Sequence, residues 1–306
     1  MRRFTVLGTL VAAGALSMTV SAFQQAAPSA PMVVEAQKLK DNLYVMTGGG
    51  GNSGVFIAAD GVTVVDTKLP GWGQPLLDKI KTLTDKPIVR IINTHTHFDH
   101  VSGNVEFPAT VDVVTHENTK TYMEQANPVY GLQTGVQPNI FTQNNGRGMS
   151  KRTFRDKLTI GRGADQIDVY HYGPAHTGGD AYVVFTALRV MHVGDTMPTR
   201  DQPIMDKNNG GTGVGYAATI AKAAATPGVD TIINGHNATT MTPADLKLYS
   251  EHIADFVKFA QDAKRAGKTV DEVVATWRVP AKYAGYNMPN PMRVRSNAQV
   301  VFDETR

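Results

Sequence analysis

The sequence predicts an α+β fold in which two β-sheets pack face to face and helices lie outside them. Each half of the chain carries short apolar runs that predict strands, followed by segments with helical spacing. Each half also shows a strand that ends in a polar loop. The composition, with 42% hydrophobic and 19% charged residues in a chain of 306, is that of a globular protein with ample length for a core.

Short apolar runs separated by Gly and Asp predict strands in the first half. The expected strands span residues 43–47, 54–59, 62–65, 88–92 and 111–115. Helical spacing of Leu and Ile predicts a helix at 72–83, and a second helix is expected at 116–125.

The second half repeats this order of strands before helices. Strands are expected at residues 166–172, 181–186, 189–193 and 231–233, and helices at 215–225, 246–266 and 269–277. The tail after Pro280 carries little signal of either kind.

The first 22 residues predict a secretory signal peptide. Arg2 and Arg3 form a short positive region, residues 4–20 are apolar, and residues 20–22 read Val-Ser-Ala, a small-x-small cleavage signal. An uncleaved membrane anchor is the alternative, because the apolar stretch approaches spanning length. We therefore expect a periplasmic or secreted protein with no stable membrane association after cleavage.

After the signal we expect a linker at 23–36 and a single domain at 37–306. Within it, residues 127–150 are rich in Gly, Asn, Gln and Pro. Such a long irregular stretch inside a compact domain is usually disordered or functional. We interpret it as a lid or a wall of the site.

Charge and cysteine content limit the function. Without Arg2 and Arg3, 28 basic residues face 27 acidic ones, and no basic run is present. A nucleic-acid partner is therefore not expected. The chain has no cysteine, so any metal must be held by His, Asp or Glu. The expected partner is a small-molecule substrate, and the sequence does not reveal the oligomeric state.

Residues 94–100, Thr-His-Thr-His-Phe-Asp-His, are the strongest signal in the chain. His95 and His97 are two positions apart, so an extended segment turns them to one side. Asp99 and His100 follow on the next turn and could face a second metal. Three of the chain's nine histidines fall within these six positions, which makes chance the weaker interpretation. Imidazole and carboxylate suit zinc, with other divalent transition metals as alternatives.

Three further polar residues follow predicted strands and lie next to or shortly before glycines. They are His176, Asp195 and His236. Glycine lets the backbone bend sharply and approach a ligand closely. Each signal is weak alone, but together with the first motif they predict a site at one edge of the sheets.

This ordered set resembles the metallo-β-lactamase superfamily over roughly residues 43–237. The resemblance implies a four-layer αββα sandwich with a two-zinc site at one edge. It implies one zinc on His95, His97 and His176, a second on Asp99, His100 and His236, and Asp195 bridging them. Asp66 matches the early aspartate that supports the site from behind.

The sequence also departs from the pattern of subclass B1 β-lactamases. Their cysteine is missing, and Asp195 stands at that point. The lysine that follows the cysteine and holds the substrate carboxylate is also absent, although Arg200 or Lys207 could replace it. The histidine set itself looks like subclass B3. β-Lactamase activity is therefore compatible with the resemblance but is not implied by it.

The expected activity is hydrolysis of a β-lactam, lactone, ester or thioester. A bound zinc lowers the pKa of water to about 7 and so supplies a zinc-bound hydroxide. Asp99 is the expected catalytic residue, orienting the hydroxide and passing a proton to the leaving group. The alternatives are an iron-dependent oxidoreductase similar to persulfide dioxygenases, a phosphodiesterase, and a silent binding protein.

Other residues are assigned lesser roles. Thr94, Thr96 and Thr177 flank the ligands and are candidates for hydrogen bonds to them. Residues 208–211 and Tyr216 are expected to line the pocket. The remaining histidines are interpreted as structural: His116, His171 and His192 in or beside strands and helices, and His252 exposed on the long helix.

Overall fold

The computed structural model describes residues 31–132 and 138–306. The predicted signal peptide lies outside these residues, as does most of the predicted linker. The first strand begins at Glu35, just inside the range expected for the linker. Within the described ranges, no helix combines the length and apolarity needed to cross a membrane.

The first sheet contains seven strands that neighbour one another in chain order. They are β1 (Glu35–Lys40), β2 (Leu43–Thr47), β3 (Ser53–Ile57), β4 (Val62–Val65), β5 (Ile88–Ile92), β6 (Asp112–His116) and β7 (Arg152–Phe154). Strands β1 to β4 pair antiparallel, and β4 to β7 pair parallel. The parallel strands therefore send their carboxyl ends to the same edge.

The second sheet contains five strands in the order β12-β11-β10-β9-β8. They are β8 (Lys157–Ile160), β9 (Ile167–Tyr170), β10 (Tyr182–Phe185), β11 (Val190–His192) and β12 (Thr231–Ile233). Only β11 and β12 pair parallel; the other pairs are antiparallel.

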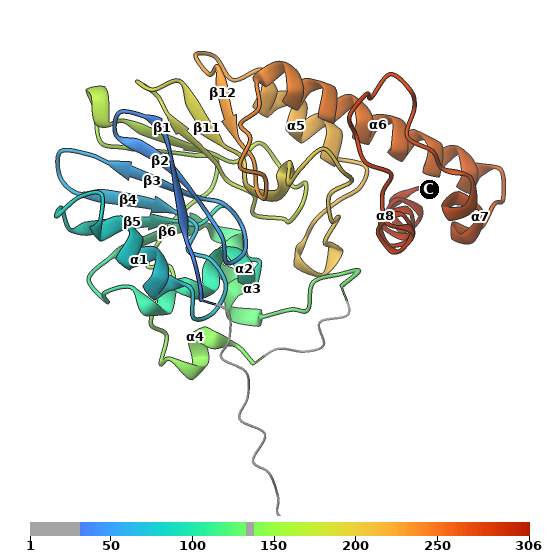
Figure 1. Ribbon diagram of the computed structural model, residues 1–306. Coiled ribbons are helices and arrows are strands. Elements are labelled where there is room, and N and C mark those ends of the chain that lie inside the picture. The colour runs from blue at the N-terminus through green and yellow to red at the C-terminus, as the bar shows by residue number, and fades with distance from the viewer. Residues whose placement is uncertain (1–30, 133–137) are drawn as a thin grey trace, which may run out of the picture. The chain divides into compact units, whose positions relative to one another are not determined.

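Helices lie beside both sheets (Figure 1). The first half supplies α1 (Gly73–Lys81), α2 (Phe98–Val101), α3 (Glu117–Gln125) and α4 (Ile140–Gln143). The second half supplies α5 (Tyr216–Ala224), α6 (Pro243–Arg265), α7 (Val270–Thr276) and α8 (Pro291–Glu304). The two sheets with helices outside confirm the predicted αββα sandwich.

Three apolar clusters hold these layers together. Phe56 of β3 and Phe185 of β10 meet between the sheets, with ring centroids 5.2 Å apart. Val55, the neighbour of Phe56, faces the other side and packs with Leu76 and Ile80 of α1. This alternation follows from the two-residue period of a strand, which lets one strand serve two layers. A third cluster joins the second sheet to α5, α6 and α8.

The structure agrees with most of the expected elements and adds several. The strands at 88–92 and 231–233 have the predicted bounds. Strands β1, β7 and β8 and helix α8 were not predicted. In β7 only Phe154 is buried, so the apolar alternation that marks a strand is missing. Helix α8 begins at Pro291 after an Asn290 cap. An Asn followed by Pro is a helix start signal, but the prediction from sequence did not use it.

The prediction for His252 was wrong. The residue lies on the long helix α6 but is only 1% exposed. The reason is tertiary, because the chain after α7 returns across α6. There Tyr283 and Tyr286 pack against the imidazole, each with its ring centroid 4.9 Å away.

Candidate metal centre

The predicted site residues come from loops that follow strands. His95 and His97 lie directly after β5, and Asp99 and His100 lie on α2. His176 stands in the loop between β9 and β10, Asp195 in a short turn after β11, and His236 after β12. The structure therefore brings together seven side chains that span 142 positions of sequence.

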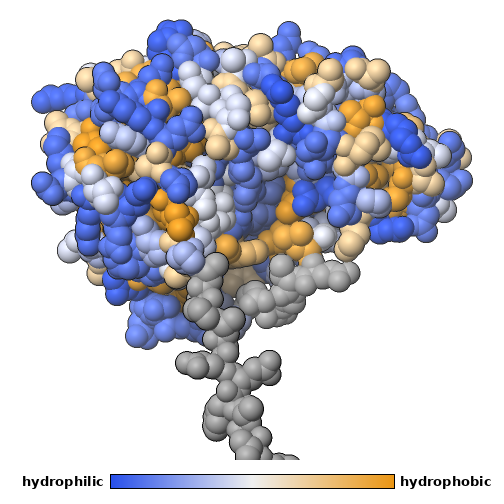
Figure 2. All heavy atoms as spheres, viewed as in Figure 1, coloured by the Kyte–Doolittle hydropathy of each residue, from blue (hydrophilic) through white to orange (hydrophobic). Residues whose placement is uncertain are grey.

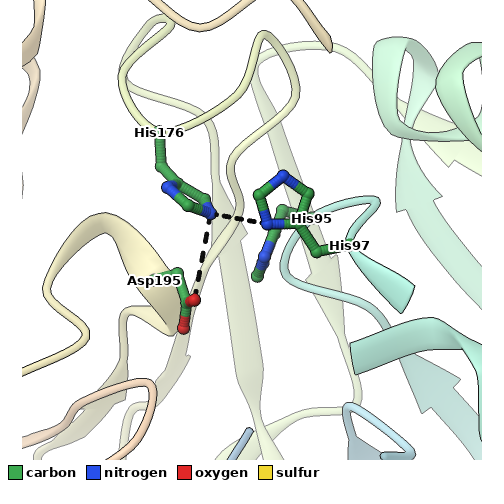
Figure 3. A group of neighbouring side chains, drawn as sticks. All are labelled: His95, His97, His176 and Asp195. Atoms are coloured by element: carbon green, nitrogen blue, oxygen red, sulfur yellow. Dashed lines mark hydrogen bonds and ion pairs between the residues drawn. The ribbon is translucent and has the colours of Figure 1, made fainter. Parts of the chain in front are cut away.

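Four of them form a buried group, namely His95, His97, His176 and Asp195. Each offers a ligand atom within 4.8 Å of the others. Figure 3 shows the side chains pointing toward one another, with His176 Nε2 3.0 Å from His97 Nδ1 and 3.9 Å from Asp195 Oδ2. The four residues are between 1% and 7% exposed, so bulk water reaches them little.

A second group adjoins the first and consists of Asp99, His100 and His236, again within 4.8 Å of one another. Asp195, a member of the first group, also contacts the second, since its Oδ2 lies 3.0 Å from His236 Nε2 and its Oδ1 3.3 Å from His100 Nε2. Asp195 therefore occupies the position between the groups that the resemblance implies. This second group is the open side of the centre, because the side chain of His236 is 32% exposed.

The donor set fits metal ions. Among the described residues, His95 Nε2 has no hydrogen-bond partner although it is buried. A buried polar atom without a partner costs about 1–3 kcal/mol, and a metal ion would satisfy it. Burial, followed by the neighbouring His100, His176 and His97, holds the pKa of His95 well below its usual value. His95 is therefore a neutral imidazole, the form that ligates metals.

His176 and Asp195 of the buried group are also in ligating form. Burial and the nearby His97 lower the pKa of His176 to about 3. Burial alone would raise the pKa of Asp195, but His100 and His236 hold it well below its usual value. His95 and His176 thus offer neutral imidazoles and Asp195 offers a carboxylate, as a divalent cation requires.

Three of the candidate imidazoles are oriented through their second nitrogen. His100 Nδ1 lies 2.7 Å from Asp66 Oδ2, and His176 Nδ1 lies 2.7 Å from the Ile204 carbonyl oxygen. His95 Nδ1 lies 2.9 Å from the hydroxyl of Thr94, which itself bonds to Asp66. These contacts fix each ring and leave its other nitrogen for a metal.

Asp66 lies behind the centre, as predicted, and its backbone is strained. Its φ of 60° is in the left-handed region, which an aspartate adopts less readily than glycine. The conformation lets one carboxylate reach the Thr94 backbone amide and hydroxyl as well as His100. Strain of this kind persists where surrounding bonds over-determine the backbone.

Asp206 is a site residue that the sequence reading missed. It is fully buried, and its Oδ2 lies 2.8 Å from His97 Nε2. Its carboxylate also accepts hydrogen bonds from the backbone amides of Tyr130 and Asn208 and from the side chain of Asn209. Burial would raise the pKa of Asp206, but these bonds keep it below the usual value. A lone Asp in a loop carries no motif, so only the fold reveals its role.

The predictions for the flanking threonines and for Tyr216 are only partly confirmed. Thr94 makes the expected contact with a candidate ligand. Within the described residues, Thr96 and Thr177 make no side-chain hydrogen bond to any of the seven, and Thr177 bonds Asp180 instead. Tyr216 is fully buried, and its hydroxyl donates to the Asp195 and Thr196 carbonyl oxygens.

Arg200 and Lys207, the two residues that could replace the missing lysine, both form ion pairs. Arg200 pairs with Asp245 at 3.0 Å, and Lys207 pairs with Asp303 at 2.7 Å. Arg293 at the start of α8 differs, because no described carboxylate lies within ion-pair distance of it, and one nitrogen donates to the Gln202 carbonyl oxygen at 3.1 Å. Burial lowers the pKa of Arg293, while Tyr249, Asp201 and Asp195 oppose this effect.

Arg293 lines a cavity of about 270 Å³ together with Gln202, Met292 and Leu132. This cavity adjoins residues 201–202, which precede the Ile204 carbonyl that holds His176. It therefore places Arg293, whose side chain makes a single hydrogen bond to the described residues, beside the segment that supports the metal centre.

The chain matches the family model described as the Metallo-beta-lactamase superfamily over residues 46–236. A curated relative, a metallo-beta-lactamase type 2 from Elizabethkingia meningoseptica, is 29% identical over 193 residues. The match covers 58% of this chain and 66% of the relative, slightly less than two thirds of its length.

Two solved structures share the fold at low identity. A metallo-beta-lactamase from Pontibacter korlensis gives a TM-score of 0.59 at 18% identity, covering 72% of this chain and 99% of that one. A stereoselective inverting sec-alkylsulfatase from Pseudomonas sp. gives 0.65 at 14% identity, covering 89% of this chain and 50% of that one. The residues before α6 make up less than 89% of the chain. The similarity to the sec-alkylsulfatase therefore includes part of the C-terminal helices.

Proposed function

Because this chain belongs to the metallo-beta-lactamase superfamily, we propose that it is an exported hydrolase that holds two zinc ions and cleaves a small carbonyl substrate. The superfamily is mostly hydrolytic and metal-dependent, and the chain carries a candidate metal site at His95, His97, His176 and Asp195. We therefore propose four further points: that the metal is zinc, that two ions bind, that the substrate is a small carbonyl compound, and that the protein is exported.

The observation that carries the proposal is the pair of adjoining groups that share Asp195. Its Oδ2 is 3.0 Å from His236 Nε2 and 3.9 Å from His176 Nε2. One carboxylate contacting imidazoles of both groups suits two cations placed side by side. In the proposed arrangement one zinc is held by His95, His97 and His176, and the other by Asp99, His100 and His236.

The protein groups would then divide the work of hydrolysis. When bound, zinc lowers the pKa of water toward about 7 and polarises a carbonyl oxygen. Asp66 and Asp206 hold His100 and His97 in ligating orientation. Asp99, whose side chain is 19% exposed, lies on the open side, where it can take a proton from the attacking water and pass it to the leaving group.

A β-lactam is the first substrate to test. The curated relative is named a metallo-beta-lactamase, and export would bring the enzyme to substrates outside the cytoplasm. Arg293 is the proposed binding residue for an anionic group on the substrate, since Arg200 and Lys207 are already paired. A guanidinium binds a carboxylate or a sulfate through two parallel N–H donors.

A sulfate ester is the second candidate, favoured by one observation. The likeness to the sec-alkylsulfatase extends into the C-terminal helices, and α8 of this chain supplies Arg293. The same arginine would hold a sulfate in that case.

The test is hydrolysis by the zinc-loaded mature protein. The panel holds a chromogenic cephalosporin, an acyl-homoserine lactone, a glutathione thioester, a nitrophenyl phosphodiester and a secondary alkyl sulfate. His97→Ala removes a proposed ligand, and His171→Ala serves as the matched control, because His171 belongs to neither group. Turnover that is lost only in His97→Ala supports the proposal, and the substrate cleaved names the class.

Metal analysis by mass spectrometry separates the remaining alternatives. Two zinc ions per chain are expected. Bound iron with no hydrolysis would favour the iron-dependent oxidoreductase, and cleavage of the phosphodiester alone would favour the phosphodiesterase.

A further inference from the structure

A second cavity, of about 100 Å³, lies against His97 on the side of α2 and α3. Its walls come from α2, from the end of α3, and from residues 126–129 and 138–141. His97 belongs to both the cavity wall and the buried ligand group, so the cavity and the metal centre share a side chain. The space-filling view shows apolar residues along the lower middle of the visible face (Figure 2).

The lining is apolar and carries no formal charge. Phe98, Val101, Met123, Val129 and Phe141 contribute apolar side chains to its wall. No Asp, Glu, Lys or Arg is found among the described residues that line it. A charged group would lose its hydration there without meeting a side chain of opposite formal charge among the described residues, whereas an apolar group would gain burial.

The wall is held in place by hydrogen bonds rather than by packing alone. Asn139 caps α4 by accepting from the Phe141 and Thr142 amides, and its side-chain nitrogen donates to the Met123 carbonyl oxygen at 2.9 Å. This joins the far wall of the cavity to α3. The cavity therefore keeps its form without a ligand, as most small-molecule sites do.

Asp206 joins this wall to the metal centre. Its Oδ1 accepts from the Tyr130 backbone amide at 2.9 Å, next to Val129, while its Oδ2 holds His97 at 2.8 Å. A group placed in the cavity thus lies beside a proposed ligand whose orientation depends on the same carboxylate.

We propose that this cavity binds an uncharged apolar substituent of the substrate, either a short alkyl chain or an aromatic ring, carried next to the scissile bond. This inference rests on the proposed function and assigns to the cavity part of the enzyme's specificity for its substrate. Burial of one methylene group changes binding about fourfold. Catalytic efficiency should therefore rise about fourfold for each methylene until the cavity is full.

The kinetic test uses 4-nitrophenyl acetate, butyrate and hexanoate with the zinc-loaded protein. The expected result is an increase in kcat/KM with chain length for the wild type. Val129→Trp fills the cavity, because Val129 is 6% exposed and lines it, and should remove the dependence on chain length. Val214→Trp is the matched control: Val214 is 44% exposed elsewhere, and this variant should behave as the wild type.

A binding test needs no activity and keeps the two proposals separable. Saturation-transfer NMR with toluene should detect binding to the wild type and to Val214→Trp, but not to Val129→Trp. Binding with this pattern in a protein that hydrolyses nothing would retain the cavity and reject the hydrolase. Hydrolysis with no dependence on chain length, or toluene binding unaffected by Val129→Trp, would reject the cavity and retain the hydrolase.

Discussion

Replacing Asp206 by asparagine tests whether this residue, which the sequence did not predict, stabilises the fold and supports metal binding. The carboxylate accepts four hydrogen bonds, two on each oxygen: Oδ1 from the Tyr130 and Asn208 amides, and Oδ2 from His97 and Asn209. In Asp206→Asn an NH₂ group replaces one of the two oxygens. Because an NH₂ group cannot accept hydrogen bonds, it faces two donors without bonding to them, whichever way the amide turns. Two charge-assisted bonds are lost.

The structure gives the size of the effect. Loss of two such bonds at about 1.5 kcal/mol each lowers the free energy of unfolding of the metal-free protein by about 3 kcal/mol. In either orientation of the amide, His97 also loses the negatively charged partner that orients its ring. Removal of such a partner weakens metal binding about 10- to 100-fold, or about 1.4–2.7 kcal/mol.

The assay is competition for zinc against a chromogenic chelator, with urea unfolding of the same samples to confirm that the variant is folded. Asp303→Asn is the matched control, because Asp303 is exposed and pairs only at the surface with Lys207. Zinc affinity of folded Asp206→Asn within twofold of the wild type would refute the role given to Asp206.

Three further outcomes are expected. Chelation should abolish hydrolysis and lower the melting temperature, and added zinc should restore both, as followed by activity and calorimetry. Burial lowers the pKa of His252 to about 4, so the contribution of this residue to stability should be full above pH 6.5 and fall by about 3 kcal/mol as the pH drops to 4 and below. Urea unfolding across this range should show a weaker pH dependence in His252→Phe, while His116 and His192, whose pKa burial also lowers to about 4, keep their contributions. Arg293→Ala should lower kcat/KM about 10- to 100-fold for an anionic cephalosporin and leave 4-nitrophenyl acetate within twofold; equal losses on both would contradict anion binding.

Local pattern was enough to predict the elements that are apolar and regular. The strand at 88–92 and the helix at 72–83 are examples, because burial of one face imposes a period that the residues display. Pattern failed for β7, where a single buried residue leaves no period. It failed also for His252, whose burial depends on Tyr283 and Tyr286 from a later part of the chain.

The sequence by itself identified the donor side chains of the candidate metal centre. The spacing of His95, His97, Asp99 and His100, and the position of three more donors after strands, suffice because strand ends meet at one edge of a sheet. The tertiary structure alone decided how these donors are held and what adjoins them. Asp206, Arg293 and the cavity beside His97 arise from loops and a helix distant in sequence, and no local pattern records which distant groups a folded chain brings into contact.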